Sequence, residues 1–165
     1  MEQLKHQLTK NVKFLHKVAI VRNNQGQKEA LILQRASDAK SRPNCWDLPG
    51  GNVEWPASGQ ASAADLHQAD VAREVLEEAN LVVDQKIFDL TNLVHFSSYF
   101  AAEKDIYTVI CGWGINFSDT DQAEVKISDE HQAQAWVSLA DLANYDFGGV
   151  KGEFVKHTIS EALKK

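Results

Sequence analysis

In one segment of the chain, the apolar residues recur with a different period from those in the flanking segments. Between Asp65 and Ala79, small and apolar residues recur every three or four positions, which is typical of an amphipathic helix. We expect Asp65 to be the N-cap or a first-turn acid, and Asn80 to be the left-handed residue that ends the helix. On a wheel of about 100° per residue, one side collects the small and apolar residues Ala69, Ala72, Val75, Leu76 and Ala79.

Segments rich in Val, Ile, Leu and Phe flank this helix. Residues 13–22 and 29–35 are predicted strands, joined by the turn sequence 23–26. Strands are also expected at 45–48, 90–100, 106–117 and 134–137, a short helix at 138–144 and a closing helix at 150–163. This order favours an α/β fold in which helices flank a mixed β-sheet.

Length and charge limit the classes of protein. The 165 residues are the length of one ordinary domain, so we expect a single domain over 1–165. A net charge of −6 argues against an extended nucleic-acid surface, which needs a basic stripe. It leaves room for an anionic substrate, because a bound divalent cation inverts the local charge.

The N-terminal part of the chain carries no cleavable apolar segment. The apolar run 14–21 is interrupted by His16 and Lys17, so it is read as a strand and not as a signal or membrane span. Cys45 and Cys111 form neither a disulfide framework nor a metal-ligand spacing. We therefore expect a cytoplasmic protein with two reduced thiols and no membrane partner.

The polar side of the predicted helix is strongly acidic. Asp70, Glu74, Glu77 and Glu78 fall within an arc of about 100°, with Arg73 as the nearby compensating charge. Like charges at these spacings repel, and hard carboxylate oxygens are the ligands that Mg²⁺ or Mn²⁺ prefers. The alternative is a solvated outer face, which is common on helices.

The residues upstream of the helix favour the metal. The chain contains Gly51 in a Leu-Pro-Gly-Gly turn, then Arg-Glu-Val-Leu-Glu-Glu at 73–78, and closes on Leu81. This order resembles the Nudix family, whose signature is Gly, five residues, Glu, seven residues and Arg-Glu-apolar-x-Glu-Glu-x-Gly-apolar. Segments 31–35, 46–51, 129–130 and 135–139 also look like family segments, so the resemblance spans 18–142. It implies a Nudix-type α/β/α sandwich with its Nudix box at 51–81.

Three departures from the family pattern are present. Thirteen residues separate Gly51 from Asp65 where the family has five, an eight-residue expansion that leaves the helical register unchanged. Asp65 stands where the family has Glu. Asn80 replaces the closing Gly, and Asn tolerates the left-handed conformation well.

The resemblance implies a magnesium-dependent pyrophosphohydrolase, with manganese as a second usable ion. Such enzymes cleave a diphosphate linkage in a nucleoside diphosphate derivative. The implied metal ligands and catalytic residues are the carbonyl of Gly51, Glu74, Glu77 and Glu78, with Arg73 orienting the glutamates. Glu130 is the expected general base, and His131 beside it is the alternative.

The sequence says less about the residues that support the metal ligands and about the substrate. Glu54 and Asp65 are expected to support the ligands, and Trp55 is the aromatic candidate for contacting the substrate. We expect a nucleoside triphosphate or small nucleotide; the alternatives are a nucleotide-sugar or ADP-ribose pyrophosphatase, and a non-catalytic nucleotide sensor. An RNA-cap or dinucleoside polyphosphate hydrolase would favour a basic or aromatic channel, which the sequence does not clearly show. The resemblance is also compatible with a homodimer.

Overall fold

The computed structural model describes residues 11–54, 67–117 and 124–165. These residues form a six-stranded sheet, two α-helices and four short 3₁₀ helices. Within the described ranges, no helix is long and apolar enough to cross a membrane. The elements are β1 (Val12–Asn24), β2 (Gln27–Arg35), β3 (Trp46–Asp47), α1 (Gln68–Ala79), η1 (Gln85–Ile87), β4 (Leu93–Ala101), η2 (Ala102–Lys104), β5 (Ile106–Asn116), β6 (His131–Val137), η3 (Leu139–Asn144), η4 (Gly149–Gly152) and α2 (Glu153–Lys164).

The sheet is mixed, as the sequence predicts. Its order is β3-β2-β1-β5-β4, and β6 also pairs with β2. The strands β1 and β5 run parallel, from the pair Val12 and Tyr107 to the pair Val21 and Asn116. The other pairings are antiparallel. A parallel pair needs a long crossover, and the chain between β1 and β5 contains α1 and the edge strand β4.

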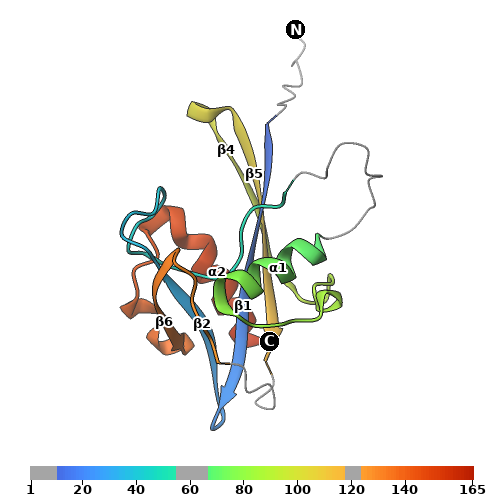
Figure 1. Cartoon of the computed structure of the whole chain (residues 1–165), viewed down its shortest axis with the longest axis vertical. Helices are drawn as coiled ribbons and strands as arrows, with labels where there is room; N and C mark the ends of the chain where they lie inside the picture. Colours follow the sequence, from blue (N-terminus) through green and yellow to red (C-terminus); the bar gives the residue numbers. More distant parts are fainter. Residues whose placement is uncertain (1–10, 55–66, 118–123) are drawn as a thin grey trace, which may run out of the picture.

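Both faces of the central strands are buried, because a helix covers each face (Figure 1). Val18 and Ile20 of β1 pack in the core that contains α1, whereas Ala19 and Val21 pack in the core that contains α2. This alternation follows from the two-residue period of a strand. The predicted α/β/α sandwich is thereby confirmed. In Figure 1, the β4–β5 hairpin extends beyond the two helices.

The turn between β1 and β2 occurs where the sequence predicts it. Gln25 and Gly26 both have positive φ angles, 52° and 89°, as a two-residue hairpin turn requires. Other boundaries differ from the prediction. The strand β6 begins at His131 instead of residue 134, and the expected helix at 138–144 is the 3₁₀ helix η3. The closing helix is preceded by η4, so α2 itself starts at Glu153.

The start and the buried side of α1 also differ from the prediction. Asp65 lies outside the described residues, and the residue that caps α1 is His67, with a left-handed φ of 56°. Leu76 was expected to face the core, but it is 44% exposed. The side chains of α1 that are buried are Val71, Val75, Glu78 and Ala79. The helix is therefore rotated about its axis relative to the simple wheel, and this rotation carries one acid of the polar side into the interior.

Candidate active site

The helix α1 is held by the packing of its buried side chains and by its C-terminal end. Val71 and Val75 pack with Val18 and Leu33 of the central strands, so the helix lies across one face of the sheet. At the C-terminal end Asn80 has φ 57° and ψ 30°, and its N–H donates to the carbonyl of Leu76 at 2.9 Å. This is the left-handed termination predicted for Asn80. Together these contacts fix the rotation of the helix and the direction of its glutamates.

Glu78 is the buried acid of this helix. Only 8% of the residue is exposed, and its Oε2 accepts a hydrogen bond from the backbone N–H of Gly50 at 2.7 Å. Burial raises the pKa of Glu78 from 4.5 to about 7, although Lys17 and the Gly50 N–H favour its charged form. Lys17 and the Gly50 N–H therefore do not fully compensate the negative charge of the buried Glu78 carboxylate, and a bound cation would favour its ionised form.

The Gly50-Gly51 turn brings the backbone against two of the glutamates. Gly50 has φ 126°, and a Cβ atom there would lie 2.2 Å from the carbonyl oxygen of His16. At Gly51, a Cβ would lie 2.5 Å from Oε2 of Glu74. A side chain is therefore excluded at Gly50 by the backbone of His16, whereas at Gly51 it would displace the carboxylate of Glu74. The carbonyl of Gly51 accepts the N–H of His16 at 2.9 Å, and its second lone pair remains available to a ligand.

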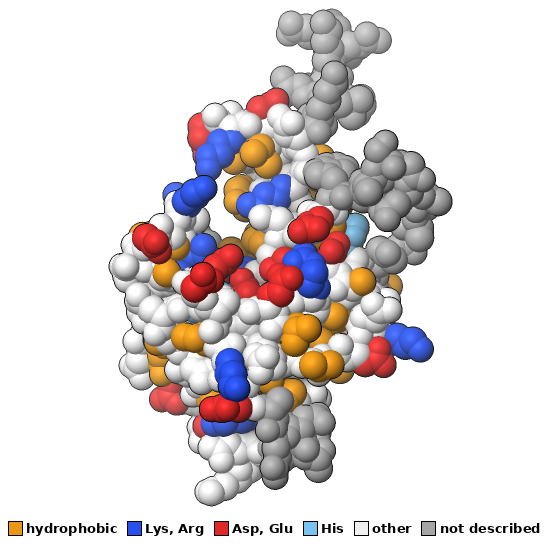
Figure 2. All heavy atoms as spheres, in the orientation of Figure 1, with side chains coloured by type: hydrophobic (Ala, Val, Ile, Leu, Met, Phe, Trp, Pro, Cys, Tyr) orange, Lys and Arg blue, Asp and Glu red, His pale blue; other side chains and the backbone are white. Residues whose placement is uncertain are grey.

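Arg73 is surrounded by carboxylates. It lies 3.0 Å from Glu74, 2.8 Å from Glu77, 3.6 Å from Asp70 and 3.8 Å from Glu54. We call Arg73, these four acids and Glu78 the α1 acidic cluster; Figure 2 shows acidic side chains gathered around a basic one near the middle of the visible face. Burial raises the pKa of Glu74 even though Arg73 lies beside it.

A second ion cluster lies beneath the same turn and was not predicted as part of the site. Asp47, 1% exposed, contacts Lys17 at 3.2 Å, Arg35 at 3.4 Å and Arg42 at 2.6 Å. We call these four residues the Asp47 cluster. Burial alone would raise the pKa of Asp47, but the three cations and the N–H of Leu48 hold it below its usual value.

Lys17 links this cluster to the glycine turn. It is 4% exposed, and its ammonium donates to the carbonyls of Leu48 and Gly50, at 3.0 and 2.7 Å. The signal in the sequence was a charge at a position that strand alternation assigns to the interior. Asp47 gives no such signal, because it lies between the apolar Trp46 and Leu48 and strand alternation places it on the opposite face.

A cavity of about 520 Å³ brings the two clusters together. Among the predicted site residues, Gly51, Glu54, Glu74, Glu78 and Glu130 line it. Glu77 and Arg73 do not; Glu77 is largely exposed and is held by Arg73. Trp55 and Asp65 lie outside the described residues.

The two candidate bases lie in different surroundings. Glu130 is exposed and lines the cavity just before β6. His131 is buried, and its Nδ1 lies 3.3 Å from the hydroxyl of Ser128. Burial lowers the pKa of His131 to about 4, and the positive charges of Lys17 and Arg35 act in the same direction. Only Glu130 of the two faces the cavity, so the geometry favours it.

The donor set fits a hard divalent cation. Glu74, Glu78 and the Gly51 carbonyl supply oxygen atoms at one wall of the cavity, and the absence of a side chain at Gly51 keeps that wall open. In the described ranges, no three side chains of His, Cys, Asp or Glu are already gathered as a metal site. Arg73 pairs with Glu74 and Glu77, while Glu78 accepts the Gly50 N–H.

A family model for the NUDIX domain matches residues 14–158. The chain belongs to the Nudix family. The expected class, a hydrolase of phosphoric anhydrides, is thereby confirmed, and members of this family generally use divalent metals. No curated protein sequence matches this Nudix chain significantly.

Solved structures show the same fold. The MutT protein of Methanosarcina mazei Go1 is 22% identical over 96% of this chain and 97% of its own, with a TM-score of 0.58. The NUDIX domain of Shewanella oneidensis NrtR, complexed with ADP ribose, is 14% identical over 96% and 89%, with a TM-score of 0.63. An Ap4A hydrolase of C. elegans is 22% identical over 89% and 95%, with a TM-score of 0.55.

Proposed function

We propose that this protein hydrolyses a diphosphate linkage in a nucleoside diphosphate derivative, with Mg²⁺ as its natural cofactor and Mn²⁺ as a substitute. The observation that carries the proposal is the buried Glu78 beside Glu74 and the Gly50-Gly51 turn, at the wall of a cavity of about 520 Å³. A chain selected for stability alone would not bury a carboxylate whose pKa is raised to about 7.

In this proposal Glu74, Glu78 and the carbonyl of Gly51 hold the metal, and Glu77 completes or shares it. When bound, the cation polarises the phosphoryl oxygens and lowers the pKa of water. Arg73 orients Glu74 and Glu77 through contacts of 3.0 and 2.8 Å. Glu54, 3.8 Å from Arg73, supports that arrangement.

Glu130 is the proposed general base. Its carboxylate takes a proton from water as the water oxygen forms a bond to one phosphorus. The bond between that phosphorus and the bridging oxygen breaks, and the second phosphate leaves with the bridging oxygen. Arg35 and Arg42 line the same cavity and offer positive charge to the phosphates.

We propose a nucleoside triphosphate or another small nucleotide as substrate, and the cytoplasm, where such nucleotides are available, as its location. The similar S. oneidensis domain is complexed with ADP ribose, and the similar C. elegans protein is named an Ap4A hydrolase. The test therefore also includes ADP-ribose and dinucleoside polyphosphates. A homodimer remains a prediction.

The test is a substrate panel with Mg²⁺ and with Mn²⁺, in which phosphate, pyrophosphate and nucleoside monophosphate products are measured separately. We expect turnover by the wild type and a loss of at least a hundredfold in Glu74→Gln and Glu78→Gln. Glu161→Gln is the matched control, because Glu161 is exposed on α2 and pairs with Lys164. Equal turnover by all four proteins would refute the mechanism, and nucleotide binding without turnover would favour the sensor.

A further inference from the structure

A second cavity adjoins the proposed catalytic one. It has a volume of about 600 Å³ and lies between the β4–β5 hairpin and the segment that leads into α2. Lys13, Leu15, Ser41 and Arg42 line both cavities. The two spaces therefore meet at these four residues, and a substrate held by its diphosphate at α1 would extend from the first towards the second. We call this second space the distal cavity.

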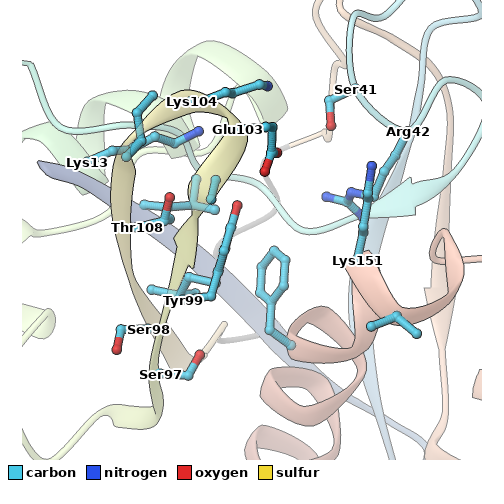
Figure 3. Close-up of a pocket in the computed structure, with 16 residues that line it drawn as sticks. Lys13, Ser41, Arg42, Ser97, Ser98, Tyr99, Glu103, Lys104, Thr108 and Lys151 are labelled. Carbon is cyan, nitrogen blue, oxygen red and sulfur yellow. The ribbon is translucent and has the colours of Figure 1, made fainter. Parts of the chain in front are cut away.

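The distal cavity is basic, although the chain as a whole carries a net charge of −6. Among the described residues that line it, four have cationic side chains and Glu103 is the one carboxylate. Figure 3 shows Lys13 and Lys104 on one wall and Arg42 and Lys151 on the opposite wall. The described lining of the catalytic cavity has more carboxylates than cations: Asp47, Glu54, Glu74, Glu78 and Glu130 against Lys13, Lys17, Arg35 and Arg42.

The four cations of the distal cavity differ in what they already bind. Arg42 contacts Asp47 at 2.6 Å and donates to the carbonyl of Phe147 at 3.0 Å, so it is a fixed part of the wall. Within the described residues, Lys13, Lys104 and Lys151 make no ion pair and are exposed. These three ammonium groups are therefore free to move towards an anion.

We propose that the distal cavity binds a second phosphate group of the substrate, one that is not part of the cleaved linkage. The substrate class is then a nucleoside diphosphate derivative that also carries a phosphate monoester. This inference rests on the proposed function for the position of the diphosphate, and it adds a requirement on the other end of the molecule.

The chemistry of the lining supports this assignment. A lysine ammonium is a compact charge on a flexible stem, which suits a phosphate monoester whose oxygens can be approached from several sides. Hydroxyl groups of Ser97, Tyr99 and Thr108 also line the space and can donate to phosphate or sugar oxygens. In Figure 3 the hydroxyl end of Tyr99 points into the gap between the two basic walls.

The test compares pairs of compounds that differ by one phosphate monoester. ADP-ribose is paired with ADP-ribose 2′-phosphate, and dephospho-coenzyme A with coenzyme A, which carries a 3′-phosphate. Dissociation constants are measured calorimetrically with Mg²⁺ in proteins that also carry Glu130→Gln, so that turnover does not interfere while the cation is present, and kcat/KM is measured with Mg²⁺ without that change. We expect the phosphorylated member of at least one pair to bind about tenfold more tightly, and the pair that shows it identifies the position of the phosphate.

The variants Lys104→Ala and Lys151→Ala should each reduce that preference, and the double variant should bring the ratio close to one. Lys28→Ala is the matched control, because Lys28 is an exposed lysine on β2 that lines neither cavity. Binding of the unphosphorylated members reports whether the variants remain folded. A ratio of one in the wild type for both pairs, or a preference that survives in the double variant, overturns the inference.

The two proposals fail in different ways. A lysine-dependent difference in affinity without turnover of any compound would sustain the distal phosphate site and refute hydrolysis. Turnover of both members of each pair with equal kcat/KM and equal affinity would sustain hydrolysis and refute the distal site.

Discussion

Two ion clusters contribute residues to the same cavity, and their balance of charge is opposite. In the Asp47 cluster one buried carboxylate is surrounded by three cations, at 2.6, 3.2 and 3.4 Å. In the α1 acidic cluster one arginine serves four carboxylates, and Glu78 is buried beside them. The first cluster already contains the charge that its carboxylate needs, whereas the second is short of positive charge.

This difference gives the Asp47 cluster a structural role, in addition to the positive charge that Arg35 and Arg42 offer to phosphate. Lys17 of the Asp47 cluster also bonds the carbonyls of Leu48 and Gly50, so that cluster fixes the turn on which the site is built. The α1 acidic cluster gains nothing from its excess of carboxylates unless a cation joins it. The contrast leads to two predictions of stability, one for each cluster, of which the first has the larger effect.

Replacing Asp47 with asparagine should cost stability. The change leaves Lys17, Arg35 and Arg42 without their shared carboxylate, and breaking such a buried pair costs about 3–5 kcal/mol. Urea unfolding at pH 7 measures it. Asp38→Asn is the control, because Asp38 is an exposed loop residue, and it should change the free energy of unfolding by less than about 0.5 kcal/mol. Equal values for the two variants would show that the Asp47 cluster is not structural.

Replacing Glu78 with glutamine should instead raise the free energy of unfolding at high pH. Glu78 has a pKa of about 7 in the folded protein, against an ordinary pKa of 4.5 for this side chain. Between these values the folded state keeps a proton that the unfolded state has lost, so stability falls as pH rises from 4.5 to 7. The full displacement corresponds to about 3 kcal/mol. Glu78→Gln does not titrate, so it should be more stable than the wild type at pH 8 without metal.

The measurement is urea unfolding of both proteins at pH 5 and pH 8 in EDTA. His16 and His131 have pKa values lowered to about 4 by burial, which makes stability rise with pH, but both proteins contain them and their contribution cancels in the difference. The control Glu161→Gln should follow the wild type. Parallel curves for the wild type and Glu78→Gln would mean that burial of this carboxylate carries no cost.

The sequence predicted the elements well and the orientation of α1 less well. The richness of 13–22 and 29–35 in Val, Ile, Leu and Phe was enough to predict β1 and β2, and the turn at Gln25-Gly26 followed from the turn residues 23–26. The wheel placed Leu76 inside and Glu78 outside, and both assignments were wrong. Propensity fixes that a helix forms, but its rotation depends on the sheet on which it packs.

The site was only partly predictable for the same reason. The spacing of Glu74, Glu77 and Glu78 shows that they share a helix, but it does not show that Glu78 meets the N–H of Gly50, 28 positions earlier. Arg42 contacts Phe147, which lies 105 positions later, and Lys13 and Lys151 line one cavity. Both arrangements depend on the parallel β1–β5 pairing and on α2. Those contacts are set by topology, which the local pattern does not contain.

The central claim is that the excess negative charge of the α1 acidic cluster is a place for a divalent cation. Calorimetric titration of Mn²⁺ into the metal-free protein at pH 8 tests it directly, with Glu78→Gln beside the wild type and Glu161→Gln as control. The account predicts that the wild type and the control bind Mn²⁺ equally, and that Glu78→Gln binds about a hundredfold more weakly. Equal Mn²⁺ affinity in the wild type and Glu78→Gln would contradict it.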